Sequence, residues 1–306
     1  MALIKCVECG HMISDKSEKC VKCGCPTRLS LFSRGLEIDS GFLFGVGDCK
    51  EKNIIIPEGI TGIGEWAFFG CNFIEKIIIP ETVVTIGTNA FQDCSELKSI
   101  NLPNGITEIS CGMLSGCSSL TNIIIPNSIV SIETSAFSYC SNLNSIIIPE
   151  NVKHIRKNAF YDCSNLSDII IHEGVVDIGE EAFCGCSSLT GIKIPNGITG
   201  INNSSFCGCK KLKSVYLPEG ITYIGDEAFA YCDQLTEITI PKSMISISSE
   251  AFTDSNKLKR IKYNGTCYDW RRSNWCRQLD VPSSCIIECR NGTLKYNDDD
   301  DDGLPF

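Results

Sequence analysis

The residues best suited to chemistry are four cysteines near the N-terminus, spaced Cys6-x2-Cys9-x10-Cys20-x2-Cys23. Two thiolate pairs with this spacing suit one tetrahedral Zn²⁺ ion and leave no open coordination position, so we predict a structural zinc site rather than a catalytic one. A glycine directly follows each pair, which suits tight turns in which backbone amides approach the sulfurs. A module this short cannot fold by apolar burial alone, so the metal would supply its stability.

The module resembles the short zinc ribbons found at the start of many bacterial proteins, and we assign it residues 1–26. The spacing between the two pairs is shorter than in some four-cysteine zinc sites, and Cys25 offers a fifth thiol. A redox dithiol and plain disulfides are the alternatives to zinc for this pattern.

A second set of cysteines recurs once every 23 residues. Each follows a phenylalanine or its equivalent by three residues, on an apolar periodicity, and free cysteine is among the most buried residue types. We therefore predict small, reduced core residues; bridges between stacked neighbours are the alternative. The set is Cys71, Cys94, Cys117, Cys140, Cys163, Cys186, Cys209 and Cys232, with Ser255 at the next equivalent position.

These cysteines belong to a repeat that covers residues 54–260 without an insertion. Its consensus is I-x-I-P-[EN]-x-[IV]-x-x-I-G-x-x-A-F-x-x-C-x-x-L-x-x, and a fixed period of this length is typical of a leucine-rich-repeat solenoid. We predict nine stacked 23-residue repeats, with a parallel β-sheet on one face and short helical turns and loops on the other. They start at Ile54, Ile77, Ile100, Ile123, Ile146, Ile169, Ile192, Val215 and Ile238.

The repeat of residues 146–168 illustrates the expected local structure. Alternation predicts that Ile146 and Ile148 point inward from a short strand while Ile147 points outward. Pro149 ends the strand, because it cannot donate a hydrogen bond to the ladder. Residues 158–160 are expected to form a turn that enters a short helical segment on the opposite side.

The flanking segments complete the predicted domain organisation. Residues 27–35 form a linker, and residues 36–53 and 261–296 form N- and C-terminal caps, because the end units of a solenoid must cover its open core and sheet edges. Residues 297–306 form an acidic disordered tail. The aspartates at 298–302 lack the interspersed glycine and glutamate of a calcium loop, which favours a solvated tail over a calcium site.

The repeat resembles the BspA-like (Treponema pallidum type) leucine-rich repeat. The segments IIIPEGITGIGEWAFFGC and LPEGITYIGDEAFAYC match that family's pattern almost throughout, and IKYNGTCYDW resembles its terminal unit. The resemblance implies a curved solenoid used for binding, as in surface adhesins of gut and oral bacteria and some protozoa. The chain differs from that pattern in its cysteine-rich N-terminal module.

The composition and the N-terminal residues bear on where in the cell the protein is located. The chain of 306 residues is 43% apolar with a formal net charge of −10, so it has no broad basic face for nucleic acid. The start, MALIKCVECGHM, has no apolar core of a secretory signal, and no run of apolar residues is long enough to span a membrane. We therefore predict a cytoplasmic protein, with the cell surface as the alternative by family analogy.

The second position of each repeat is the candidate binding surface, because the core does not dictate it. It reads as an apolar stripe that gives way to polar residues, and exposed apolar patches often mark partner sites. The alternative is that β-branched residues simply suit a strand surface. The candidate partner-binding residues are Ile55, Ile78, Ile124, Ile147, Ile170, Lys193 and Tyr216, with Asn101 interrupting the stripe.

Taken together, these features predict a non-enzymatic protein–protein interaction scaffold with a structural Zn²⁺ module. No nucleophile, base and orienting acid fall in matching register, and the three histidines are scattered. One alternative is an adhesin exported without a recognisable signal. Another is a nucleic-acid or ribosome-associated protein that binds through basic residues of the ribbon: Lys5, Lys16, Lys19, Lys22 and Arg28.

Overall fold

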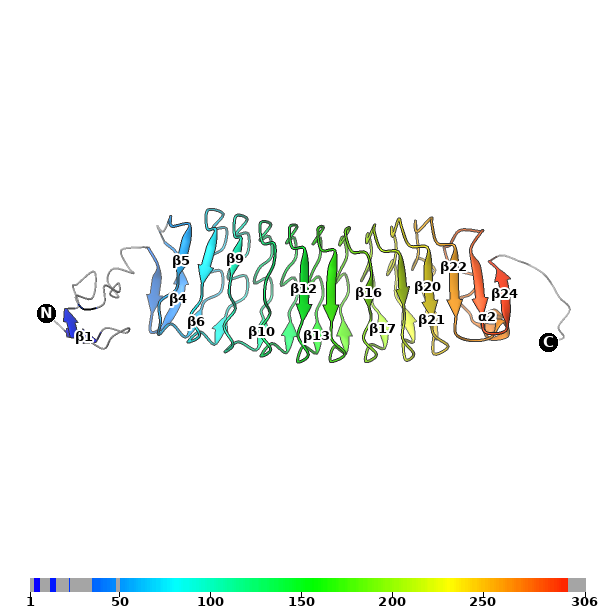
Figure 1. The fold of residues 1–306 in the computed structure, drawn as a ribbon, viewed down its shortest axis with the longest axis horizontal. Helices are drawn as coiled ribbons and strands as arrows, with labels where there is room; N and C mark the ends of the chain where they lie inside the picture. The colour runs from blue at the N-terminus through cyan, green and yellow to red at the C-terminus, as the bar shows by residue number, and fades with distance from the viewer. Residues whose placement is uncertain (1–2, 6–11, 15–21, 23–34, 48–49, 297–306) are drawn as a thin grey trace.

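The computed structural model describes residues 3–5, 12–14, 22, 35–47 and 50–296. The nine repeats stack as successive rungs along the long axis of an elongated solenoid (Figure 1). Rung 1 begins at Ile54 and rung 9 at Ile238, and positions 1 to 23 are counted from the start of each rung. The parallel, in-register stacking confirms the predicted repeat solenoid. A rung has three sides: a first strand, which rung 4 lacks, a second strand and a turn side.

The first sheet comes from the I-x-I-P step of the rungs other than rung 4. Its strands pair in parallel, with Ile146 beside Ile169 and Ile147 beside Ile170. They form three hydrogen-bonded groups: β5 (Asn53–Ile55), β7 (Lys76–Ile78) and β9 (Ser99–Ile100); β12 (Ser145–Ile148) and β14 (Asp168–Ile171); and β16 (Ile192–Lys193), β18 (Ser214–Tyr216), β20 (Glu237–Ile240) and β22 (Arg260–Tyr263).

A second parallel sheet, which the sequence analysis did not foresee, comes from positions 9 and 10. Its strands are two residues long, and the isoleucine of each points into the core. Its groups are β6 (Gly62–Ile63) and β8 (Thr85–Ile86); β10 (Glu108–Ile109), β11 (Ser131–Ile132), β13 (His154–Ile155) and β15 (Asp177–Ile178); and β17 (Gly200–Ile201), β19 (Tyr223–Ile224) and β21 (Ser246–Ile247).

The third side consists of hydrogen-bonded turns. In rung 5 the N–H groups of Asn158 and Phe160 donate to carbonyls of the next rung, at 3.0 and 2.8 Å, while the N–H of Ala159 bonds back within its own rung. This alternation uses left-handed backbone at position 13, where Asn158 has φ 57°. Because every second N–H leaves the rung, residues 158–160 are turns rather than the start of a helical segment.

Aromatic and thiol columns fill the core. The phenylalanines at position 15 stack along the axis, with ring centroids 5.2 Å apart for Phe137 and Phe160. The cysteine of each rung from rung 2 onward donates its S–H to the backbone carbonyl at position 15 of the rung before, as Cys163 does to Phe137 at 3.1 Å. Ser255 makes the same bond, from its hydroxyl to the Phe229 carbonyl at 2.7 Å. The columns therefore hold the rungs together by packing and by hydrogen bonds.

Different sheets are extended at the two ends of the solenoid. The hairpin of β3 (Glu37–Asp39) and β4 (Phe42–Gly45) pairs in parallel with β6 and continues the second sheet. At the other end β23 (Ile286–Cys289) and β24 (Gly292–Lys295) continue the first sheet beyond β22. The helix α2 (Cys267–Arg272) begins with a capping box, and its buried Trp270 packs edge-on against Tyr263 and Trp275.

The hydrogen-bonded ladders are interrupted at particular rungs. In the first sheet Asn101 inserts its side chain, which accepts from the N–H of Ile79 at 2.8 Å and donates to the Ile79 carbonyl at 2.7 Å. In the second sheet Ser110 and Asn202 donate from their side chains to carbonyls of the preceding rung. At these positions polar side chains form the hydrogen bonds between rungs in place of main-chain groups.

Candidate protein-binding face

The predicted stripe lies on the outer face of the first sheet. Its apolar members alternate along each strand with buried residues, and their exposed fractions run from 38% for Ile78 to 86% for Ile124. Neighbouring members lie side by side across the ladder, as Ile55 does with Ile78. We call Ile55, Ile78, Ile124, Ile147 and Ile170 the apolar stripe.

The stripe continues into polar residues over the later rungs. Lys193 and Tyr216 pair across β16 and β18, and both side chains are exposed. The ammonium group of Lys193 lies 2.6 Å from a carboxylate oxygen of Glu173, and this hydrogen bond lowers the pKa of Glu173 below its usual value. All seven predicted partner-binding residues therefore lie on one solvent-facing surface.

The centre of the stripe is opened by a break in the sheet. Residues 123–126 of rung 4 form no strand, and within the described chain the main chain of Ile123, Ile124 and Ile125 has no hydrogen-bond partner. A hollow of about 600 Å³ lies here between rungs 4 and 5, lined in part by Ile124, Ile147, Glu150 and His172. Ile124, the most exposed isoleucine of the described residues, therefore lies beside main-chain N–H and C=O groups that have no hydrogen-bond partner.

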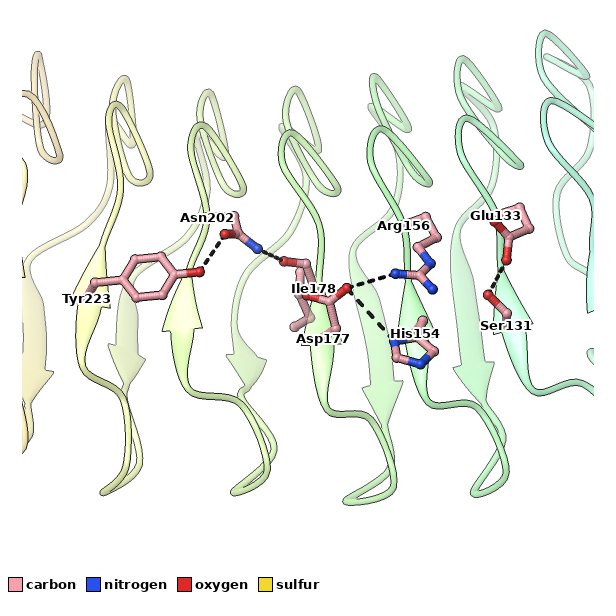
Figure 2. A network of polar contacts seen from close by, with 8 residues as sticks. All are labelled: Ser131, Glu133, His154, Arg156, Asp177, Ile178, Asn202 and Tyr223. Carbon is pink, nitrogen blue, oxygen red and sulfur yellow. Dashed lines mark hydrogen bonds and ion pairs between the residues drawn. The ribbon is translucent and has the colours of Figure 1, made fainter.

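The outer face of the second sheet carries a polar network that the sequence analysis missed (Figure 2). His154 lies on strand β13 with its Nδ1 3.9 Å from a carboxylate oxygen of Asp177. Arg156 Nη1 lies 3.4 Å from the same oxygen, and Tyr223 donates its hydroxyl hydrogen to Asn202 at 2.6 Å.

The network was missed because position 9 has no consensus residue, and position 11, which is glycine in the consensus, carries Glu133, Arg156 and Asn202 in these rungs. The only available signal was spacing: residues 23 apart lie on adjacent rungs, as His154 and Asp177 do. The ion pairs lie at the surface, where such pairs contribute little to stability. The second sheet therefore presents a polar outer face.

The four predicted zinc ligands, Cys6, Cys9, Cys20 and Cys23, lie outside the described residues, as does Cys25. Strands β1 (Leu3–Lys5) and β2 (Met12–Ser14) are described and pair antiparallel, with Ile4 opposite Ile13. Within the described ranges no group of three or more histidine, cysteine, aspartate or glutamate side chains could hold a metal ion.

The fourteen cysteines from Cys94 to Cys289 are free thiols. Those of the core column from Cys94 to Cys232 are kept protonated by burial, which raises the pKa of Cys140 and of Cys232 to about 12. A protonated thiol can donate the hydrogen bond that each makes to a carbonyl of the preceding rung. In the parts of the chain that the structure describes, we find no helix with the length and apolar character needed to cross a bilayer.

Stacked parallel strands, an axial phenylalanine column and an exposed face with variable residues define a leucine-rich-repeat β-solenoid. The family pattern described as BspA type leucine rich repeat region (6 copies) matches residues 46–167 and 153–278, which is more than half of the chain. The chain belongs to the BspA-type leucine-rich repeat family. No curated protein matches the sequence.

Forty-three chains of known structure match the fold. A leucine-rich repeat protein from Bacteroides ovatus is 25% identical over 83% of this chain and 76% of its own, with a TM-score of 0.66. The Treponema pallidum leucine-rich repeat protein is 27% identical over 66% of this chain and 86% of its own, with a TM-score of 0.47. A leucine-rich cell surface protein from Faecalibacterium prausnitzii is 25% identical over 77% and 94%, with a TM-score of 0.43.

Proposed function

We propose that the protein is a non-enzymatic scaffold that binds a protein partner through the apolar stripe and the open rung beside it. The observation that carries this proposal is the run of exposed isoleucines on the first sheet, centred on Ile124 at 86% exposure. Burying exposed isoleucines on association removes apolar surface from water, worth about 25 cal/mol per Å² before the costs of association. The unpaired main chain of Ile123 to Ile125 adds donors and acceptors that a partner's backbone can satisfy.

A binding role agrees better with the described surface than catalysis does. Charged groups on both outer faces form ion pairs, as Lys193 does with Glu173 and Arg156 with Asp177. A catalytic site requires a nucleophile or base held beside groups that stabilise developing charge. The outer faces of the two sheets instead provide a large surface for apolar contacts and hydrogen bonds, which is suited to binding a partner protein.

The test compares two triple variants of equal charge change. Replacing Ile124, Ile147 and Ile170 with aspartate places three charges on the stripe. Replacing Val84, Val130 and Val176 with aspartate places three charges at position 8 instead, just before the strands of the second sheet. These valines are also about half exposed. Both variants should keep the wild-type circular dichroism spectrum, because all six side chains are exposed.

Affinity capture with quantitative mass spectrometry, from cells that make the protein, is the readout. Partners captured by the wild type should be depleted at least tenfold with the stripe variant and retained with the position-8 variant. Equal capture by all three folded proteins would remove the stripe from the proposed function.

We further propose that residues 1–26 fold around a structural Zn²⁺ ion. Its support is the donor set, two Cys-x2-Cys pairs, together with the β1–β2 pairing that flanks the first pair: β1 ends at Lys5 and β2 begins at Met12. Tetrathiolate coordination is the preferred structural zinc geometry and leaves no site for substrate.

A chelator tests the zinc proposal. Chelation should release one zinc ion per chain and leave the strand signal of the solenoid in circular dichroism unchanged. A chain that is purified without zinc, yet is protected from proteolysis over residues 1–26, would contradict the proposal.

We propose that the protein works in a reducing compartment, and the support is the set of free thiols from Cys94 to Cys289, in which the core column from Cys94 to Cys232 has no bridge between neighbours. Disulfides form and persist in oxidising environments, so cysteines at this density would be at risk outside the cell. Protease added to intact cells should spare the protein and cut a known surface protein. Cleavage of both would favour the surface location suggested by family analogy.

A further inference from the structure

The solenoid has a seam between rung 6 and rung 7. Within the nine described rungs, this is the one step at which neither ladder continues: β14 does not pair with β16 in the first sheet, and β15 does not pair with β17 in the second. At the other interrupted steps one of the two sheets carries through. Asn202, which donates from its side-chain nitrogen to the Ile178 carbonyl at 2.6 Å, stands where the second ladder would have crossed.

The turn side therefore supplies most of the main-chain hydrogen bonds that cross the seam, and the N–H of Lys213 donates one more, to the Thr190 carbonyl at 3.4 Å. The N–H groups of Glu181, Phe183 and Gly185 donate to carbonyls of rung 7 at 3.0, 2.9 and 2.8 Å. The acceptor for Gly185 is the carbonyl of Cys207. A covalent link on this side would reinforce the step of the solenoid that has the fewest backbone bonds.

Two partly exposed cysteines stand at this place. Cys184 and Cys207 both occupy position 16 on the turn side, and the Phe183 and Gly185 bonds hold them next to each other on adjacent rungs. Rungs stack about 4.8 Å apart, inside the roughly 4.4 to 6.8 Å between Cα atoms that a disulfide spans. Among the nine position-16 residues only these two are cysteine, and they are consecutive.

We propose that Cys184 and Cys207 form a reversible disulfide that clips rung 6 to rung 7. A metal site is not favoured here, because the described residues hold no third ligand near the pair. The proposal does not depend on partner binding by the stripe. The disulfide would make the strength of the junction between rungs 1–6 and rungs 7–9 depend on the redox state.

The reaction is thiol–disulfide exchange with a low-molecular-weight disulfide such as oxidised glutathione. The thiol of Cys184 hydrogen-bonds to Cys207 and lowers the pKa of Cys207, and the same contact raises the pKa of Cys184. The Cys207 thiolate therefore attacks the glutathione disulfide and releases one glutathione thiolate. Cys184 then gives up its proton to water, its sulfur attacks the Cys207 sulfur, and the second glutathione leaves. Two protein thiols are oxidised, and one glutathione disulfide is reduced to two glutathiones.

The experiment uses the full-length protein, first reduced and then equilibrated in glutathione buffers of increasing oxidised fraction. After alkylation of the remaining thiols, trypsin cuts after Lys193 and separates Cys184 from Cys207. The wild type should yield one cross-link between peptides 158–193 and 194–210. Those peptides also contain the buried Cys163, Cys186 and Cys209, so five single serine variants assign the bond.

The cross-link should be lost in Cys184→Ser and Cys207→Ser and kept in Cys163→Ser, Cys186→Ser and Cys209→Ser. The latter three are matched controls that should fold, because Ser255 occupies the equivalent core position naturally. Amide exchange at Glu181, Phe183 and Gly185 should slow by about tenfold on oxidation of the wild type and not in Cys184→Ser.

Three results would overturn the proposal. One is a wild type with no cross-link at any glutathione ratio. A second is a stable mixed disulfide on Cys207 that Cys184 does not resolve. The third is a cross-link that persists in Cys184→Ser, since it would then join other sulfurs.

Discussion

At the scale of single residues, the repeat is held by two side chains that do different work. Each phenylalanine at position 15 contributes a buried ring that stacks on its neighbours, such as Phe160 on Phe183 with centroids 5.4 Å apart. Each cysteine at position 18 contributes a donor that a larger or apolar residue would not supply. The recurrence of cysteine is thus explained by a thiol small enough for the core and able to donate to the preceding rung.

Replacing Phe160 with alanine should lower the free energy of unfolding by about 3 to 5 kcal/mol, because a fully buried ring between two others is lost. Urea unfolding followed by circular dichroism measures the change. Ile124→Ala is the control, since that side chain is 86% exposed and should cost less than about 1 kcal/mol. Similar costs for the two variants would contradict the core column.

The hydrogen bond of the thiol column can be isolated at Cys163, whose sulfur donates to the Phe137 carbonyl at 3.1 Å. Cys163→Ser keeps a donor of similar size, and Cys163→Ala removes it. We expect alanine to be the less stable variant by about 1 kcal/mol, the net worth of one hydrogen bond. An alanine variant as stable as the serine variant would show that the column serves packing alone.

At the scale of elements, the three sides of a rung are set by different local rules. The first strand follows from alternation and ends at proline. The turn side depends on left-handed backbone at positions 13 and 17, where glycine, asparagine and aspartate recur but Glu181 and Tyr231 also adopt φ near 55°. Such non-glycine residues are held in place by the bonds that their N–H groups make to the next rung.

Gly185→Ala tests that rule. Gly185 has φ 76°, and an added Cβ would lie 2.3 Å from a carboxylate oxygen of Asp162, so alanine should cost about 1 to 2 kcal/mol. Gly191→Ala is the matched control in the same rung, because φ there is not positive and nothing lies within 4 Å. Thermal unfolding of both variants measures the difference, and an equal effect at the two glycines would count against the turn geometry.

The sequence predicted the first strand and the outward direction of Ile147, because a two-residue alternation is visible in every repeat. It did not predict the second sheet, since a strand of two residues such as β13 shows one inward isoleucine and no alternation. The glycine or aspartate at position 17 was a readable signal for the turn side. The sequence did not predict the break in the first sheet at Ile124, because the break depends on which main-chain hydrogen bonds between rungs are missing.

At the scale of the whole molecule, the rungs act as layers of one body. The thiol column runs through it, and burial keeps those thiols protonated well above their ordinary pKa of 9.0. Below about pH 9 the thiols are protonated in both states, so the full stability is present. Above it the unfolded chain releases protons that the folded chain retains, so stability falls as pH rises toward the folded pKa of about 12.

The free energy of unfolding should therefore fall steeply between pH 9 and about pH 11. Each buried thiol contributes about 1.4 kcal/mol per pH unit, so Cys140→Ser should reduce the slope by that amount. Urea titrations at several pH values measure both slopes, and their difference removes the contribution of tyrosines and lysines. An unchanged slope in Cys140→Ser would mean that this thiol is not buried in the folded state.

The central claim is that the nine repeats are mutually dependent layers with their thiols sealed inside. Pulsed alkylation of the native reduced protein, read by peptide mass spectrometry, tests it most directly, with partly exposed Cys111 as the internal reference. We predict that the seven fully buried column thiols, from Cys94 to Cys232, stay unlabelled while Cys111 reacts, and that they become reactive only when urea unfolds the solenoid. Native labelling of column thiols in the middle rungs at the rate of Cys111 would contradict the stacked solenoid.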